Sequence, residues 1–152
     1  MAQDYQPLIH ATARTLLATV FIYAGANKAM DPAQFAEAID RYRIVPWPFA
    51  AGMGLYLPWL EIFAGVAVFF GRLRLGALAI IAGLAWVFVA AIASALVRGL
   101  DITCGCFGNG EGSSLAFSLV RSLTLAALGT YLCYCEAKGL SGRTFSAYSV
   151  KL

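Results

Sequence analysis

Two cysteines separated by a single glycine are the residues of this sequence with the clearest capacity for chemistry. Cys104 and Cys106 flank Gly105 in the stretch DITCGCFGNGEG, residues 101–112. A disulfide between cysteines separated by one residue departs from the preferred disulfide geometry. Glycine as that residue lowers the free-energy cost of the strained backbone, because glycine readily adopts positive φ. A strained, exposed disulfide exchanges readily with other thiols, whereas so short a loop restrains little of the unfolded chain. The pattern therefore favours a redox-active cysteine pair over a disulfide that stabilises the fold.

A metal site and an inert pair of thiols are the alternative interpretations. Zinc takes four protein ligands in structural sites, and His10 is the single histidine of the chain. Copper(I) accepts soft sulfur ligands, so the two cysteines can be combined with Met30 or Met53 in a copper hypothesis. We predict no metal in the leading interpretation.

The composition indicates that the pair belongs to an integral membrane protein. Hydrophobic residues make up 61% of the 152 positions and charged residues 12%, and the mean hydropathy is +0.74. A soluble domain carries about 25% charged residues, so this chain has too few to cover a surface that faces water. The net charge of +3 is scattered along the sequence, which argues against nucleic acid as a partner. The length predicts one domain, residues 1–152.

Four apolar windows predict four membrane-spanning helices. They cover about 9–29, 49–70, 75–97 and 114–135. The uncharged run between Arg74 and Arg98 exceeds the roughly 20 residues that a spanning helix needs. Backbone groups find no water inside lipid, so each span should be helical. The predicted fold class is all-α, an integral membrane four-helix bundle, in which we expect the first span to be retained and not cleaved as a signal peptide.

A short amphipathic helix is predicted between the first and second spans. Asp31 is a favourable N-cap and Pro32 suits the first helical turn. Phe35, Ile39 and Tyr42 form one apolar stripe at helical spacing. We expect this helix to lie at the membrane interface, either as a connector or as a lid over the Cys-Gly-Cys loop.

The distribution of Lys and Arg predicts the orientation of the bundle. With four spans, both termini and the turn after the second span share one side. That side holds Arg72, Arg74, Lys138, Arg143 and Lys151, and the other side holds Lys28, Arg41, Arg43 and Arg98 among five acidic residues. The positive-inside rule then places both termini in the cytoplasm of a bacterial cell, with the chain in the inner membrane. The Cys-Gly-Cys loop would face the oxidising, extracytoplasmic side.

Three charged residues, Arg14, Glu61 and Arg121, fall well inside the predicted spans, while Lys28 at the end of the first span is counted with the loop that follows it. A lone charge at mid-bilayer costs from about 3 to over 10 kcal/mol, so we expect Glu61 to pair with Arg121. Arg14 would either extend to the cytoplasmic face or join the pair from below. The pair is interpreted as a structural lock between helices or as a polar pocket beneath the Cys-Gly-Cys loop that binds a quinone or relays protons. A quinone is the natural acceptor for two electrons from a membrane dithiol, although no residue demands one.

Cys133 and Cys135 form a second Cys-x-Cys pattern at the end of the fourth span. Residues i and i+2 of a helix project about 200° apart, so the two thiols cannot bond to each other without unwinding the helix. We expect them to act as small apolar side chains.

Three stretches of the chain resemble the MauE family of methylamine-utilisation membrane proteins, within the wider group of DoxX-like four-helix proteins. They are GANKAMDPAQFAEAIDRYRIVP at 25–46, LPWLEIFAGV at 57–66 and CGCFG at 104–108. The resemblance implies a role in maturing a disulfide-rich, extracytoplasmic subunit of methylamine dehydrogenase, together with a thioredoxin-like partner. The motif residues it implies are Cys104, Gly105, Cys106, Phe107 and Gly108, with Glu61 and Arg121 as membrane-embedded polar residues.

The leading hypothesis from these observations is a membrane component of extracytoplasmic thiol–disulfide exchange or protein maturation. Cys104 and Cys106 would exchange with the thioredoxin-like partner and its client. The alternatives are a non-enzymatic assembly or anchoring subunit, and a copper(I)-handling membrane protein.

Overall fold

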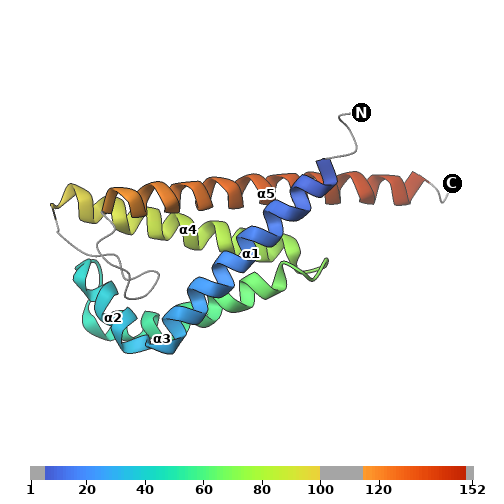
Figure 1. The fold of residues 1–152 in the computed structure, drawn as a ribbon. Coiled ribbons are helices and arrows are strands. Elements are labelled where there is room, and N and C mark those ends of the chain that lie inside the picture. The colour runs from blue at the N-terminus through green and yellow to red at the C-terminus, as the bar shows by residue number, and fades with distance from the viewer. Residues whose placement is uncertain (1–5, 100–114, 150–152) are drawn as a thin grey trace.

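Five helices make up the part of the chain that the structure, a computed structural model, describes: residues 6–99 and 115–149, with side chains for 9–99 and 117–139. In chain order they are α1 (Gln6–Met30), α2 (Pro32–Arg41), α3 (Trp47–Ala67), α4 (Arg74–Val97) and α5 (Leu115–Ser149) (Figure 1). No strand occurs within these described ranges, so the predicted all-α class is confirmed there.

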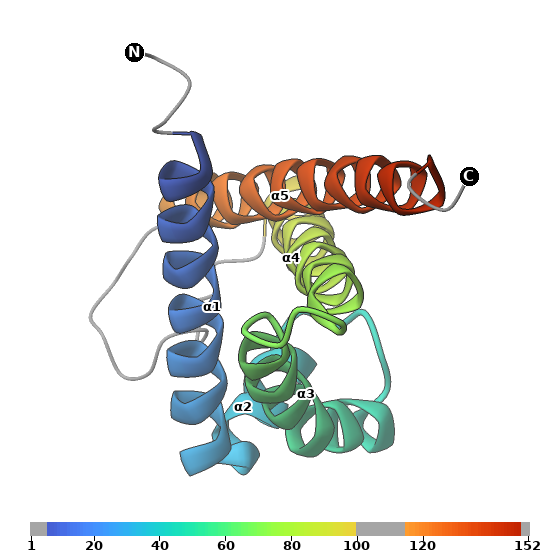
Figure 2. The same cartoon turned by 90° about the vertical axis from the view of Figure 1, so that its right-hand side faces the viewer.

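The helices pack chiefly as two pairs. α4 runs along α5, α1 packs on α3, and α2 packs on α3 as well. α1 crosses α5 steeply in both views (Figures 1 and 2). A shared core of nearly fully buried side chains joins the pairs, with Leu17 from α1, Ala64 from α3, Leu78 and Ile81 from α4, and Ala126 from α5.

Successive long helices alternate in direction, as the four-span prediction requires. The C-terminal ends of α1 and α4 and the N-terminal ends of α3 and α5 gather beside α2 (Figure 1). We call this the α2 end of the molecule. The start of α1 and the turn between α3 and α4 lie at the opposite end. The helix ends that flank residues 100–114 are therefore at the α2 end, on the same side as the connection between α1 and α3.

Three described segments are long and apolar enough to cross a membrane: Trp47–Ala67, Arg74–Val97 and Phe117–Gly139. They correspond to the predicted spans at 49–70, 75–97 and 114–135. α1 covers the predicted span at 9–29 but is not among the three, so its role as a span stays a prediction. α5 continues to Ser149, well past the predicted end of the fourth span.

The predicted short helix between the first two spans is confirmed as α2. The Asp31 carboxylate accepts a hydrogen bond of 2.9 Å from the Gln34 backbone amide, which caps the helix. Phe35 and Ala36 are buried on its inner face. A Cβ placed on Gly54 of α3 would lie 2.7 Å from the Ala36 Cβ. The absence of a side chain at Gly54 therefore allows α2 to seat directly on α3.

Candidate functional site

Glu61 of α3 forms a buried ion pair with Lys28 of α1. The Lys28 Nζ lies 2.6 Å from Oε1 and 2.8 Å from Oε2 of Glu61. The two side chains are 4% and 1% exposed, respectively. A charge buried this deeply is tolerated only when it is paired and hydrogen-bonded. The expectation that Arg121 pairs with Glu61 is therefore wrong, because Lys28 occupies that role.

Two aromatic rings complete the surroundings of the Lys28 ammonium. The Nζ atom lies 4.5 Å from the ring centroid of Phe88 on α4 and 5.1 Å from that of Phe35 on α2. Both distances are within the range of cation–π attraction. One ammonium group thus contacts side chains from α2, α3 and α4 while belonging to α1.

Gly25 brings the backbones of α1 and α3 together beside this pair. A Cβ placed on Gly25 would lie 2.8 Å from the carbonyl oxygen of Pro58 and 3.1 Å from the Cβ of Glu61. Real Cβ atoms essentially never lie within 3.0 Å of another atom. Any residue other than glycine at position 25 would therefore require α1 or α3 to move. Since Lys28 follows Gly25 by about one helical turn, the close approach sets the distance across which Lys28 meets Glu61.

A small cavity of about 40 Å³ lies beside the ion pair. Lys28, Glu61, Arg121 and Ser122 are among the residues that line it. We call these four residues the polar cluster. The structure therefore brings Arg121 to the same cavity as Glu61, although not as its ion-pair partner. The volume suits about one water molecule and is far below the roughly 300 Å³ where small-molecule pockets begin, so this cavity does not accommodate a quinone ring.

Lys28 is the charged member of the polar cluster that the sequence did not predict. The orientation argument counts it as a loop charge after the first span. α1 continues to Met30, so Lys28 lies in the last helical turn. Its flexible four-carbon stem lets the ammonium reach α3. The sequence signal for Lys28 was Glu61 itself. A carboxylate inside a span requires a cation close by, and that cation comes from whichever helix lies nearest.

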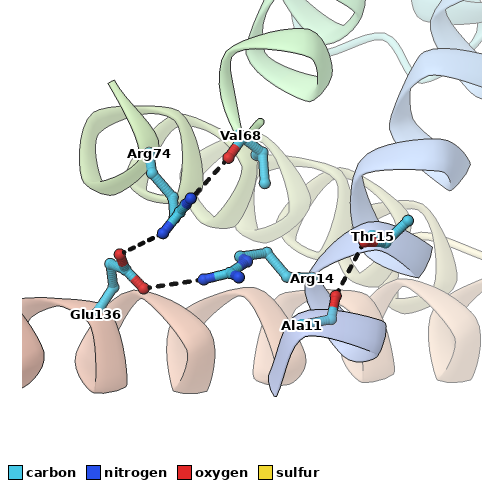
Figure 3. A network of polar contacts seen from close by, with 6 residues as sticks. All are labelled: Ala11, Arg14, Thr15, Val68, Arg74 and Glu136. Carbon is cyan, nitrogen blue, oxygen red and sulfur yellow. Dashed lines mark hydrogen bonds and ion pairs between the residues drawn. The ribbon is translucent and has the colours of Figure 1, made fainter. Parts of the chain in front are cut away.

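Arg14 belongs to a second ion cluster, together with Arg74 and Glu136 (Figure 3). Arg14 Nη1 is 3.2 Å from one carboxylate oxygen of Glu136, and Arg74 Nη1 is 3.1 Å from the other. Arg74 also donates from Nε to the Val68 carbonyl oxygen at 3.2 Å. The expectation that Arg14 joins the Glu61 pocket is wrong, since eleven residues, about 16 Å of helical rise, separate Arg14 from Gly25.

Replacing Glu136 by Gln should lower the free energy of unfolding by about 1–2 kcal/mol. The substitution removes charge-assisted bonds to two arginines and keeps the shape of the side chain. These side chains are about a quarter exposed, at 23–25%, so solvent screening limits the loss. The measurement is the unfolding midpoint of the purified protein in detergent.

The matched control is Glu37→Gln, which removes the pair between Glu37 and Arg41. That pair spans 3.9 Å with side chains 58% and 60% exposed, so its loss should cost under about 0.5 kcal/mol. Equal shifts for the two variants would show that Glu136 does not join the helices.

The predicted redox residues, Cys104, Gly105, Cys106, Phe107 and Gly108, lie outside the described residues. Cys133 and Cys135 lie on α5 as free, half-buried thiols. Cys133 packs against the shared core, as expected of a small apolar side chain.

Comparison with known proteins extends over most of the chain. The family model described as methylamine utilisation protein MauE matches residues 6–135. The MauE proteins of Paracoccus denitrificans and Methylorubrum extorquens are 33% and 32% identical to the chain; the alignments cover 81% and 85% of this chain and 67% and 72% of the relatives. That of Methylophilus methylotrophus is 30% identical, over 83% of this chain and 68% of its own length. No solved structure matches. Since the family model covers far more than half of the sequence, including the Cys-Gly-Cys stretch, this chain belongs to the MauE family.

Proposed function

We propose that this chain acts in methylamine utilisation as a membrane component of extracytoplasmic thiol–disulfide exchange or protein maturation. The curated relatives carry the name methylamine utilization protein. The family match at 6–135 includes Cys104 and Cys106. The two cysteines would exchange with a thioredoxin-like partner that matures an extracytoplasmic client.

The observation that carries the proposal is a set of hydrogen bonds at the end of α4, the last described helix before the two cysteines. Arg98, one residue beyond α4, donates to the carbonyl oxygen of Tyr42 at 2.8 Å and to that of Arg43 at 3.3 Å. These bonds join the end of α4 to the end of α2. Cys104 follows Arg98 by six residues in the sequence, so the last described residues before the cysteines belong to a helix junction that hydrogen bonds hold together. Functional sites need support from rigid elements of this kind.

The exchange is a balanced two-electron step. A thiolate of the partner attacks the Cys104–Cys106 disulfide and forms a mixed disulfide, and the partner's second thiolate then displaces the remaining sulfur. The partner gains a disulfide, and Cys104 and Cys106 take up two electrons and two protons as thiols. A membrane quinone is the proposed class of acceptor for their reoxidation, bound elsewhere than in the small cavity of the polar cluster.

The proposed location is the bacterial inner membrane, with both termini in the cytoplasm and the Cys-Gly-Cys loop outside. The burial of Lys28 in an ion pair supports this orientation. Lys28 was counted as a loop charge on the outer side, and its removal from that count strengthens the excess of Lys and Arg on the cytoplasmic side.

Cys104 and Cys106 should be oxidised in cells and accessible from outside. A membrane-impermeant maleimide should label neither cysteine of intact spheroplasts before reduction, and both after reduction. The readout is a gel-mobility shift of the Cys133→Ser/Cys135→Ser variant, which removes the other two thiols. A single Cys104→Ser or Cys106→Ser substitution should trap a reductant-sensitive adduct with a second protein.

The control is the maturation of the client in the same strains. The Cys133→Ser/Cys135→Ser variant should support it fully, and the Cys104→Ser/Cys106→Ser variant should not. A pair that stays reduced, in a double variant that still matures the client, would refute the redox function. If deletion of 104–108 then abolishes maturation, the loop recruits a partner without electron transfer.

A further inference from the structure

An apolar groove of about 670 Å³ opens between α2, α3 and α4. Its wall includes Phe35 from α2, Leu57 from α3, and Leu84, Phe88 and Ile92 from α4. The volume is within the roughly 300–1,000 Å³ of small-molecule sites. Two of the wall residues, Phe35 and Phe88, are also the rings beside the Lys28 ammonium. The groove is thus a separate space next to the polar cluster, and it has no role in the function proposed above.

Two arginines stand at the rim of this groove, at the α2 end of the molecule. Arg43 and Arg98 both line it. Arg98 bonds to neutral oxygens: the Tyr42 and Arg43 carbonyls, and the carbonyl and hydroxyl of Ser94. Within residues 6–99 and 115–149, neither arginine forms an ion pair with a carboxylate. The rim therefore carries two positive charges that these residues do not neutralise.

The position of the rim matches the headgroup level of a bilayer. The apolar segment Arg74–Val97 ends directly before Arg98. Arginine at the end of a spanning helix lies near the interface, where lipid phosphates lie. This placement holds for either orientation of the chain in the membrane.

Arg43 occupies a backbone conformation that favours glycine. Its φ is +49°, and it follows Tyr42, the C-cap of α2. Helices that end in this left-handed conformation usually have glycine at the position, because a side chain there is sterically unfavourable. The chain nevertheless carries a long cationic side chain at this point. Binding of a ligand by the guanidinium at the rim would offset the free-energy cost of this backbone conformation.

We propose that this groove is a binding site for an anionic phospholipid. An acyl chain lies along the apolar wall, and the phosphate lies between Arg43 and Arg98. Charge complementarity selects the class, since two arginines that no described carboxylate neutralises favour a lipid with net negative charge over a zwitterionic or neutral one. The bound lipid would link α2 to α4 at the point where the cysteine segment begins. The lipid site does not depend on the proposed thiol chemistry, so an experiment that refutes one of the two proposals leaves the other standing.

The test compares lipids by thermal unfolding of the purified full-length protein in neutral detergent. Phosphatidylglycerol should raise the midpoint by about 5–10 °C at 100 times its dissociation constant. Phosphatidylcholine with the same acyl chains should give at most a small shift. Native mass spectrometry should show one retained phosphatidylglycerol per protein.

Variants at the rim and in the groove separate the two parts of the site. Arg43→Gly should be at least as stable as the parent without lipid, because glycine prefers positive φ, yet should bind phosphatidylglycerol at least about tenfold more weakly. Arg43→Lys should keep the preference for the anionic lipid. Ala90→Phe should fill the groove and abolish the response, since Ala90 lines it. Ala79→Phe, on an exposed position of the same helix outside the lining, should respond as the parent does.

Three outcomes would overturn the proposal. The first is equal stabilisation by phosphatidylglycerol and phosphatidylcholine. The second is an Arg43→Gly variant that keeps the anionic preference. The third is stabilisation of parent and Arg43→Gly alike by ubiquinone, lost in Ala90→Phe, which would assign the groove to a neutral isoprenoid ligand.

Discussion

Replacing Glu61 by Gln should lower the free energy of unfolding by about 3–5 kcal/mol, because the Lys28 ammonium is then left buried without a counter-charge. The ammonium is 2.6 Å from the carboxylate, and the two side chains are 4% and 1% exposed, so bulk solvent does not reach the unpaired charge. Glutamine keeps the volume of the side chain, and the loss therefore reports the charge. The measurement is the unfolding midpoint of the detergent-purified protein.

The double variant Lys28→Met/Glu61→Gln should be more stable than either Glu61→Gln or Lys28→Met alone. Removing both charges eliminates the penalty of an unpaired buried ion, and buried pairs replaced by neutral residues often lose little stability. The coupling between the two positions should therefore be large and positive in a double-mutant cycle. Additive losses, or a Glu61→Gln variant within about 0.5 kcal/mol of the parent, would contradict the pairing.

The same double variant distinguishes a structural role of the pair from a functional one. If it folds at normal levels and supports client maturation, the ion pair serves only to join α1 to α3. If it folds but maturation fails, the charges act in the function itself. Experiments on this one strain therefore distinguish the structural interpretation of the charges from the functional one, which the sequence left open.

Replacing Gly25 by Ala should destabilise the protein by about 1–3 kcal/mol, the typical cost of overpacking. The added Cβ would lie 2.8 Å from the Pro58 carbonyl oxygen and 2.9 Å from the Ile62 Cγ1. The Pro58 oxygen is backbone and cannot rotate away, so α1 must move from α3. That movement lengthens the contact between Lys28 and Glu61 and adds to the loss.

The control for Gly25→Ala is Gly83→Ala on α4, where an added Cβ meets nothing within 4 Å. Alanine is a better helix former than glycine by up to about 1 kcal/mol, so Gly83→Ala should be neutral or stabilising. The two identical substitutions are expected to have opposite signs. A Gly25→Ala variant as stable as Gly83→Ala would show that α1 and α3 tolerate a wider separation.

The elements of the fold could be predicted because their signals are local. The uncharged run after Arg74 is long enough for a span, and it forms α4 within a residue of the predicted bounds. Asp31 and Pro32 specify the start of α2 through capping and fixed φ. Helix ends without such signals were predicted less well: α5 continues to Ser149, past the predicted end at 135 and through Gly139 and Gly142.

The partners of the buried charges could not be predicted from sequence spacing. Glu61 had two cations within reach, Arg121 and Lys28, on different helices, and the choice depends on which backbone lies closest to α3. The close approach at Gly25 makes that helix α1. For Arg14 the sequence left two alternatives open, the cytoplasmic face or the Glu61 pair, and its partner in the structure, Glu136, falls one residue beyond the predicted fourth span.

The sequence by itself determined the helices, the membrane character and the Cys-Gly-Cys pair, since each rests on neighbouring residues and on general chemistry. Only the tertiary structure decided that Lys28 neutralises Glu61, that Glu136 joins Arg14 to Arg74, and that two arginines meet at the rim of an apolar groove. The physical reason is the reach of long charged side chains. Their partners depend on distances of a few ångströms between helices that are remote in sequence, and the close packing of α1 on α3 sets the distance for Lys28 and Glu61.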